Sequence, residues 1–464
     1  MARKGTSSLY NHLSTMKPNF AMRIDNVLNY DKTITFRSEI IPDKKKGTLS
    51  TSVLYSQGSD IFEIDCELPL ETFYPQDSRS SKRRRVEEGD EEKNKTTSEQ
   101  KEKNDDESRF DDAFKNVENK RFTPKWAYLG ETVSKMSYLD SSDDSTIIAM
   151  SKNGSLAWFR DGIKVPVHIV QEMMGPATSF AAMHSHVRPN DLAVSDFGLS
   201  ASLDTLVKSH SNGSEEDSIL KVIDNAGKPG EILRTLHVPG TAVTHTVRFF
   251  DNYLYATCSD DNTLRFWDTR TDSRPLFHLT EHQNGRLTAF DTSRATDGGL
   301  FVTGSSTGVI KLWDVRAVEN ATTDLTHRQN GEEPIQHELV GLYHSGGDSV
   351  ADIQFSETSA SKFVTVGGTG NVYHWNMNCV LDYNGENDST STRSSSDRPP
   401  APRELQGQCL KFFHRAGNNG RRGPGSRPGL SRNVVALHPV INNLVGTVSP
   451  DGSLSVYRPM SLLK

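Results

Sequence analysis

Two short motifs in this 464-residue chain contain residue types that can do chemistry. Gly304-Ser305-Ser306-Thr307-Gly308 matches the GxSxG pattern, in which a serine nucleophile lies on a sharp turn between a strand and a helix. Gly368-Thr369-Gly370 has the glycines of a dinucleotide-binding loop, which also needs a following helix. Alternating apolar and polar residues flank both runs, as in two strands joined by a hairpin. We therefore interpret both as hairpin turns, with no catalytic residue in either.

Metal-binding residue types are present but do not have the spacing of a metal site. His184 and His186 share one face of a predicted strand, and no third ligand follows nearby, so we favour a structural role over a metal-ligand role for both. The four cysteines are far apart and form no CxxC pair: Cys66, Cys258, Cys379 and Cys409. With no acid–base pair to place either, we predict a non-enzymatic protein without catalytic residues, metal or cofactor.

A repeat explains where these motifs lie. Leu254 to Arg270 reads LYATCSDDNTLRFWDTR, and Leu300 to Arg316 reads LFVTGSSTGVIKLWDVR. Each copy has an apolar strand, a polar turn, a second alternating strand and a final Trp-Asp. The tryptophans Trp267 and Trp313 lie 46 positions apart, which is the period of a WD-repeat β-propeller blade with its four short strands.

Weaker copies bring the number of predicted blades to seven. Similar hairpins end at Trp158, at Trp375 and at Tyr457. Two fainter units comprise Ser52 to Asp65 and a stretch from Ser179 to Asp224 that a polar loop at 200–217 interrupts. We predict an all-β, seven-bladed WD-repeat β-propeller over residues 33–460. Its structural WD positions are Trp158, Trp267, Asp268, Trp313, Asp314 and Trp375.

Residues 1–32 are predicted to be an N-terminal helix and lead-in. Leu9, Leu13 and Met16 make one apolar stripe on this short helix, which either packs on the propeller edge or forms one wall of a groove. The alternation Thr33-Ile34-Thr35-Phe36 then supplies a strand that we expect to close the ring with the last blade.

Residues 75–118 are predicted to be a disordered insertion that interrupts the first blade and the second. The cluster Lys82, Arg83, Arg84 and Arg85 is either solvated charge or, as we favour, a nuclear localisation signal in an accessible loop. The acidic tract from Glu87 to Asp112 has too few apolar residues to fold. It either keeps the chain soluble or contacts a basic partner such as a histone.

A second predicted insertion, at 382–432, precedes the last blade. Its first part is rich in Ser from Ser389 to Ser396. Its second part is rich in Gly and in basic residues: Lys411, Arg415, Arg421, Arg422, Arg427 and Arg432. Such a loop can touch phosphate without reading bases. Because the net charge is −7, we expect no direct sequence-specific binding of nucleic acid. With neither a signal peptide nor a membrane-length apolar run, we expect a reducing compartment and no membrane contact.

Longer strings extend beyond the general WD pattern. SSLYNHLSTMKPNFAMRIDNVLNYDKTITF near the start, LSTSVLYSQGSDIFEID, and SILKVIDNAGKPGEILRTLHVPGT resemble the fungal WD-repeat transcriptional modulator family. That resemblance implies a nuclear, non-catalytic regulator that acts in repression of meiotic genes, silencing and replication-stress responses. It also implies candidate partners: ribonucleotide reductase small subunits, a histone deacetylase complex and related family members.

The chain is also similar, more distantly, to the retinoblastoma-binding histone chaperones. That similarity implies a groove for a histone helix between the N-terminal helix and the last large loop. The residues that would line it are Leu9, Leu13, Met16, Asp397, Pro399, Pro400, Leu410 and Phe413. Our leading hypothesis is a nuclear scaffold or co-repressor that docks protein partners. Its roles would include regulation of ribonucleotide reductase genes or nuclear retention of the small subunit of that enzyme. The alternative is a histone-binding subunit of a deacetylase or chaperone complex.

Overall fold

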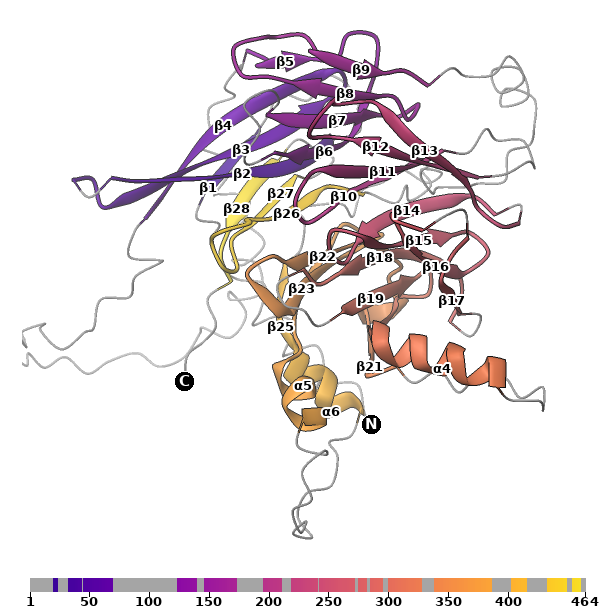
Figure 1. The fold of residues 1–464 in the computed structure, drawn as a ribbon. Helices are drawn as coiled ribbons and strands as arrows, with labels where there is room; N and C mark the ends of the chain where they lie inside the picture. The colour runs from indigo at the N-terminus through magenta and orange to yellow at the C-terminus, as the bar shows by residue number, and fades with distance from the viewer. Residues whose placement is uncertain are drawn as a thin grey trace, which may run out of the picture.

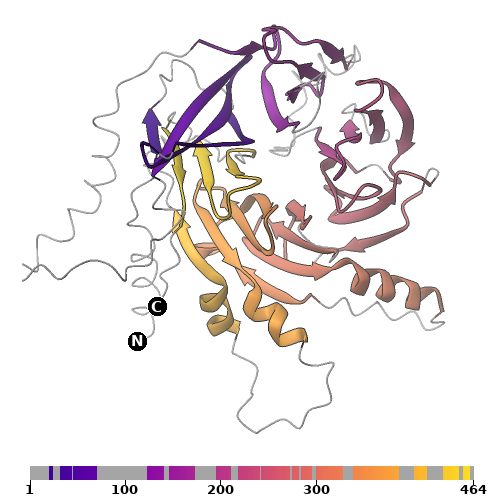
Figure 2. The ribbon, with the colours of Figure 1, turned by 60° about the vertical axis from the view of Figure 1, so that its left-hand side comes forward.

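Seven antiparallel sheets of four strands each are arranged as the blades of a ring in the computed structural model (Figure 1 and Figure 2). The predicted all-β, seven-bladed propeller is therefore confirmed. The structure describes residues 20–23, 32–43, 45–69, 123–139, 146–172, 195–210, 218–240, 242–271, 274–281, 284–294, 299–327, 338–385, 402–414, 432–448 and 453–459. The predicted N-terminal helix with its Leu9, Leu13 and Met16 stripe lies outside these residues, as do His184, His186 and the cluster from Lys82 to Arg85.

Each blade is numbered by its place in the chain. Blade 1 consists of β2 (Lys32–Asp43), β3 (Thr48–Gln57), β4 (Asp60–Pro69) and β5 (Trp126–Ala127). Blade 2 consists of β6 (Val133–Tyr138), β7 (Ile147–Ser151), β8 (Leu156–Phe159) and β9 (His168–Val170). Blade 3 consists of β10 (Phe197–Leu199), β11 (Thr205–His210), β12 (Ile219–Asp224) and β13 (Ile232–His237). Blade 4 consists of β14 (Thr244–Phe249), β15 (Leu254–Ser259), β16 (Thr263–Asp268) and β17 (Phe277–Thr280).

Within the described residues, the helices lie in and beside blades 5 and 6, and blade 7 closes the ring. Blade 5 consists of β18 (Leu287–Thr292), β19 (Leu300–Ser305), β20 (Val309–Asp314) and β21 (Val340–Tyr343), with α4 (Val315–His327) before β21. A short 3-10 turn, η2 (Ser345–Gly347), precedes blade 6, which consists of β22 (Val350–Ser356), β23 (Ser359–Gly367), β24 (Val372–Asn376) and β25 (Leu410–His414). Before β25 come α5 (Asn378–Gly385) and α6 (Pro402–Cys409). Blade 7 consists of β26 (Val435–Leu437), β27 (Val445–Val448), β28 (Ser453–Tyr457) and β1 (Phe20–Arg23).

Apolar side chains between adjacent blades form the core. Between blades 4 and 5, the ring of Phe266 stacks on Phe277 at 4.4 Å and meets Phe301 edge-on at 5.6 Å. Phe301 in turn stacks on Trp313 at 6.2 Å. Since burial of one such ring stabilises a fold by about 2–3 kcal/mol, each blade depends on its neighbour, and the ring is one folding unit.

The strand that closes the ring differs from the prediction. Strand β1 pairs antiparallel with β28, with Phe20 opposite Val456 and Arg23 opposite Ser453. The predicted closing strand, Thr33 to Phe36, instead lies within β2, the first strand of blade 1. That prediction was wrong because the long apolar alternation of β2 looks like any edge strand, whereas β1 is only four residues long. The ring is still closed by pairing an N-terminal with a C-terminal strand.

Residues 70–122 lie between β4 and β5 in the sequence, so they interrupt blade 1. Two other stretches that were predicted as loops contain strands. The polar stretch 200–217 contains strand β11, which pairs with β10 and β12. The stretch 382–432 contains α6 and β25. In β11 and β25, buried apolar side chains such as Val207 and Phe412 outweigh the polar neighbours that led us to predict loops.

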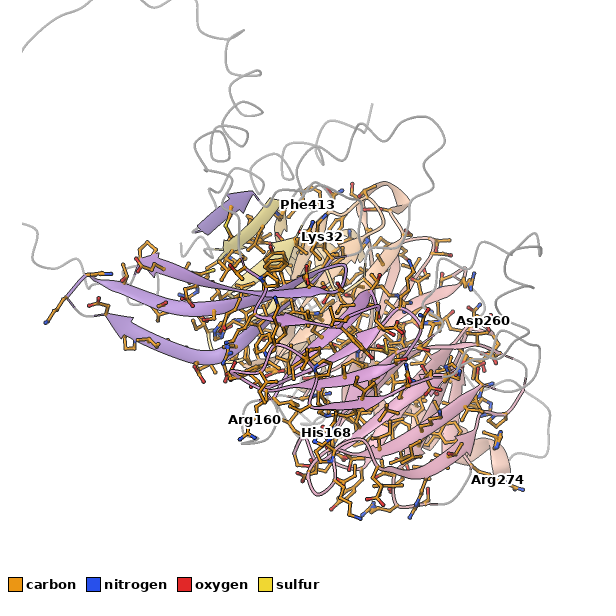
Figure 3. All side chains as sticks on the ribbon, turned by 90° about the horizontal axis from the view of Figure 1, so that it is seen from above. Lys32, Arg160, His168, Asp260, Arg274 and Phe413 are labelled. Carbon is orange, nitrogen blue, oxygen red and sulfur yellow. The ribbon has the colours of Figure 1, made fainter. Side chains whose placement is uncertain are left out.

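Blade 1 is distinguished by its length. Its first three strands have 12, 10 and 10 residues. They extend past the rest of the ring as a three-stranded projection (Figure 3). Leu49 and Leu68 on one face of this projection are buried against blade 7 and β1 residues such as Met22, whereas Asp65 and Glu67 on the other face are exposed.

Candidate functional site

The tryptophans at the WD positions are buried and bonded in one repeated way. In blades 4, 5 and 6 the indole Nε1–H of the tryptophan donates to the hydroxyl of a threonine ten residues earlier. The pairs are Trp267 with Thr257 at 3.0 Å, Trp313 with Thr303 at 3.0 Å, and Trp375 with Thr365 at 2.9 Å. Each bond joins the second strand of a blade to its third strand, so these residues maintain the blade.

Trp158 in blade 2 uses a different partner. Its Nε1–H donates to Oδ1 of Asn225 at 2.7 Å, and Asn225 Nδ2 donates to the carbonyl of Leu203. Asn225 follows the third strand of blade 3. This tryptophan therefore ties blade 2 to blade 3.

The aspartates of the two Trp-Asp pairs hold tight turns. Oδ1 of Asp268 accepts the backbone N–H of Arg270 at 2.8 Å, and Oδ1 of Asp314 accepts that of Arg316 at 2.9 Å. The Arg270 guanidinium also bonds Asp268 and holds the pKa of that carboxyl below its usual value. Arg270 lies 4.4 Å from the ring centre of Tyr253, which is 48% exposed. These bonds stabilise the turn that follows each Trp-Asp pair.

The GxSxG and GTG runs both lie in hairpins. Ser305 ends β19, and its Oγ accepts the N–H of Val309 at 3.1 Å, at the start of β20. Gly308, with φ of 82°, turns the chain. Gly368-Thr369-Gly370 likewise connects β23 to β24. Neither run starts a helix, so neither has the strand–turn–helix context of a nucleophile or a dinucleotide loop.

A network of charged side chains occupies the centre of the ring. Its members lie on, or next to, the first strands of successive blades, which meet at the middle. Asp196 accepts from Lys135 Nζ at 2.7 Å, from Arg248 Nη1 at 2.6 Å and from the backbone N–H of Val247 at 2.9 Å. Arg248 also pairs with Asp291 of blade 5 at 3.2 Å. One carboxylate thus connects blades 2, 3 and 4, and its partner extends the network to blade 5.

The pKa values in this network follow from burial and pairing. Burial opposes ionisation of Asp196, but Lys135 and Arg248 outweigh it and lower the pKa of this carboxyl to about 2. Burial and the nearby Arg248 lower the pKa of Lys135 to about 8. Three donors lie within 2.9 Å of the Asp196 oxygens, so this side chain is a carboxylate in the folded protein.

Arg432 also belongs to this centre, which corrects its assignment to an exposed basic loop. Its Nη1 donates to the carbonyl of His245 at 2.8 Å, and its Nη2 donates to the carbonyl of Thr288. The adjacent Asn433 donates from its backbone to Asp352 at 2.8 Å. Arg432 therefore ties blade 7 to blades 4 and 5. It cannot bind phosphate at the surface while it makes these bonds.

Further buried ion pairs join neighbouring blades away from the centre. Glu172, after β9, accepts from Lys208 at 2.5 Å and from Lys221 at 2.8 Å, both in blade 3. Glu281, after β17, accepts from Lys311 of blade 5 at 2.7 Å. In each case an acidic residue that follows the last strand of one blade bonds lysine in the next blade. Removal of one partner of such a pair costs about 3–5 kcal/mol.

The structure describes two members of the predicted histone groove, Leu410 and Phe413. Both are core residues. They are 6% and 5% exposed, and the ring of Phe413 lies 4.9 Å from the ring of Tyr373. The prediction that they line an open groove was wrong, because β25 is the fourth strand of blade 6 and these side chains pack into that blade. Leu9, Leu13, Met16, Asp397, Pro399 and Pro400 lie outside the described residues.

The contacts described above hold the blades of the ring together. Over the described residues, no group of three His, Cys, Asp or Glu could hold a metal ion. None of the described helices is long and apolar enough to cross a membrane. The central charges were missed by sequence reasoning, although one signal was present. Charged residues interrupt first strands that are otherwise buried, as Arg248 does in Val247-Arg248-Phe249 and Asp291 does after Phe290.

Comparisons with known proteins agree with this architecture. The family model "WD domain, G-beta repeat" matches residues 230–268 and 273–314. The solved structure "Crystal Structure of Mitotic Checkpoint Complex" contains a chain that matches with a TM-score of 0.52 at 12% identity, covering 97% of this chain and 96% of that chain. At that identity the match shows the fold alone. The fold and its repeated Trp–Thr bonds therefore define a WD-repeat β-propeller.

Curated relatives from Saccharomyces cerevisiae (strain ATCC 204508 / S288c) identify the family. The chain is 62% identical to "Transcriptional modulator WTM2" over 98% of this chain and 94% of the relative. It is 53% identical to "Transcriptional modulator WTM1" over 98% and 97%, respectively. It is 37% identical to "Transcriptional regulatory protein UME1" over 99% and 92%. The chain belongs to the fungal WD-repeat transcriptional modulator family.

Proposed function

We propose that this protein modulates transcription in the nucleus as a rigid, non-catalytic platform that docks protein partners. The observation that carries the proposal is the charged centre of the ring. Lys135, Asp196, Arg248 and Arg432 are bonded to one another or to backbone across the blades. Groups bound in this way hold the blades in place and leave the faces and rim of the propeller for binding.

The family membership supports a role in gene regulation. The relatives are named as transcriptional modulators and a transcriptional regulatory protein. By extension, we propose repression of meiotic genes, silencing, and regulation of ribonucleotide reductase genes or nuclear retention of the small subunit of that enzyme. The proposed partners are ribonucleotide reductase small subunits, a histone deacetylase complex with its histones, and related family members.

Nuclear entry is proposed to depend on Lys82, Arg83, Arg84 and Arg85. Four consecutive cations are what the acidic grooves of an import receptor bind. In the sequence, the cluster lies between β4 and β5. A partner that enters the nucleus together with this chain would hide the effect of the cluster, so the test must separate the two routes.

The experiment combines localisation with transcription. All four residues are changed to Ala, and the same variant is also made with an unrelated nuclear import signal at its C-terminus. We expect the first variant to stay outside the nucleus and the levels of its target transcripts to change. The second variant should restore both nuclear localisation and normal transcript levels. Transcripts that respond normally while the first variant stays outside the nucleus would overturn a nuclear role. Transcripts that stay altered when import is restored would assign the cluster a function other than import.

A tethering assay tests direct action on transcription. The full-length chain is fused to an unrelated DNA-binding domain and directed to a reporter gene. We expect reporter output to change relative to the DNA-binding domain alone. A matched control carries His168→Gln, which alters only an exposed side chain of β9, and should behave as the parent. No change in the reporter with a nuclear, folded fusion would contradict the proposal.

A further inference from the structure

Two cysteines that are far apart in the sequence meet at the outer edge of blade 6. Cys379 lies in the first turn of α5, and Cys409 is the last residue of α6. Their Sγ atoms are 3.5 Å apart, and both thiols are free. The other two cysteines, Cys66 on β4 and Cys258 on β15, are buried in different blades.

Fixed elements hold the two sulfur atoms in place. Val380 beside Cys379 and Leu410 beside Cys409 are both buried in the core of blade 6. Helix α6 is tied to blade 5 by a hydrogen bond from Gln406 Nε2 to the carbonyl of Tyr343 at 2.9 Å. A disulfide has an S–S distance of about 2.05 Å. The two Sγ atoms, 3.5 Å apart, must approach to that distance for the bond to form.

The two thiols differ in access. The Cys379 side chain is half-buried, whereas Cys409 is 0% exposed. Burial, together with the contact with Cys379, raises the pKa of the Cys409 thiol to about 12. The thiolate is the reactive form of cysteine. Cys379 is therefore the sulfur that a small oxidant in solution meets first, and Cys409 is placed directly behind it.

We propose that Cys379 and Cys409 form a reversible dithiol–disulfide site that a small peroxide oxidises. The Cys379 thiolate attacks one oxygen of hydrogen peroxide and becomes a sulfenic acid, and the hydroxide that leaves takes up a proton to form water. The Cys409 sulfur then attacks Sγ of Cys379, and the hydroxyl of the sulfenic acid leaves with the Cys409 proton as a second water. In total, two thiols lose two electrons and hydrogen peroxide is reduced to two molecules of water.

The bond has a defined structural consequence. It links two residues thirty positions apart and fixes α5 to α6 at the edge of blade 6, next to blade 5. In a reducing compartment the pair rests as two thiols, and disulfides there are usually transient and redox-sensing. The redox state of the pair would then set how rigidly α5 and α6 are held on the propeller.

The test uses the purified full-length chain. After a brief peroxide pulse and a catalase quench, free thiols are counted in denaturant, and proteolytic peptides are analysed by mass spectrometry without reduction. We expect the four thiols of the chain to fall to two, with one linked peptide pair containing Cys379 and Cys409. Dithiothreitol should restore all four. The oxidised protein should unfold about 4 °C higher, since a crosslink restricts the unfolded chain.

Variants assign each sulfur its role. In Cys409→Ser, peroxide should leave a sulfenic acid on Cys379 that dimedone captures, and in Cys379→Ser all three remaining thiols should survive. The matched control Cys258→Ala should fall from three thiols to one. Survival of all four thiols in the wild-type chain, a linkage through Cys66 or Cys258, or links only between two copies of the chain would each overturn the proposal. If a serine variant fails to fold, the wild-type peptide map decides alone.

Discussion

Acidification is expected to destabilise this propeller strongly, because several buried histidines are neutral in the folded state. Burial lowers the pKa of His344 to about 4 and that of His414 to about 4; burial, with the nearby His414, lowers the pKa of His374 to about 3. Burial likewise lowers the pKa of His438 to about 4. All four are less than 9% exposed.

The hydrogen bonds of His438 show independently why this ring stays neutral. Its Nδ1 accepts the backbone N–H groups of Val440 at 3.1 Å and Ile441 at 3.0 Å, so no proton can occupy that nitrogen. Its Nε2 lies 2.9 Å from the hydroxyl of Thr51 in blade 1, which fixes the other proton. Protonation would break the two backbone bonds, which hold the turn between β26 and β27.

The size and sign of the effect follow from linkage. An unfolded histidine has a pKa of about 6.5, and the folded values are lower. As pH falls through about 6.5, the unfolded chain takes up protons that the folded chain does not, so the free energy of unfolding decreases. At pH 5.5 each group lowers it by about 1.4 kcal/mol, and four groups lower it by about 5 kcal/mol. Whole domains have about 5–15 kcal/mol of stability.

Carboxyl groups do not cancel this loss. The pKa of Asp196, lowered to about 2 mainly by Lys135 and Arg248 against the effect of burial, places its titration below this range. Protonation of Asp196 removes further stability only as pH falls below about 4, which is the pKa of an aspartate in the unfolded chain. Burial raises the pKa of Asp291, which works in the opposite direction. This one carboxyl group offsets only a small part of the stability that the four histidines lose.

The assay is urea unfolding at pH 7.5, 6.5 and 5.5, followed by tryptophan fluorescence. We expect the free energy of unfolding to fall by about 5 kcal/mol across the series. His438→Gln should start less stable and lose about 1.4 kcal/mol less over the same range. The control His168→Gln, with an exposed side chain, should follow the parent. An unfolding midpoint that stays constant from pH 7.5 to 5.5 would refute the reasoning.

Three further substitutions test the ring itself. Asp196→Ala leaves two buried cations without their carboxylate and should cost about 3–5 kcal/mol in urea unfolding; a loss below 1 kcal/mol would show that the central network is dispensable. Gly308→Ala adds a Cβ 2.6 Å from a backbone oxygen at a φ of +82°, and should cost about 1–3 kcal/mol; an unchanged thermal midpoint would contradict that strain. Met22→Asp places a charge in the closing strand β1, where Met22 is 3% exposed, and should make blade 7 exchange its amide hydrogens faster than blade 4; uniform exchange would argue against closure by β1.

The blades could be predicted from the sequence because each blade carries its own local signal. Trp267 and Trp313 end hairpins whose alternation is unbroken, and the pairing of Leu254 with Asp268 follows directly from that alternation. Strand β11 has the same kind of burial in the structure. It was predicted as a loop because Lys208 and Ser209 look solvent-exposed in sequence. Burial of Lys208 depends on its contact with Glu172 of the preceding blade.

The candidate site could be predicted less well, for the same reason. The bonds of Arg432 to blades 4 and 5 connect residues 187 and 144 positions apart, and no local pattern indicates such distances. Phe413 was predicted as a groove residue from a family resemblance, but its burial depends on Tyr373, forty positions earlier. The proximity of Cys379 and Cys409 likewise depends on how α5 and α6 pack, which sequence spacing does not indicate.

The most direct test of the central claim is affinity purification of the tagged full-length chain from nuclear extract, with quantitative mass spectrometry, in parallel with Met22→Asp. A docking platform predicts that ribonucleotide reductase small subunits or deacetylase subunits are recovered in amounts comparable to the chain, and that opening the ring reduces this recovery. Recovery of the chain without any such partner, from extracts in which it still modulates transcription, would contradict the claim that this propeller acts by docking proteins.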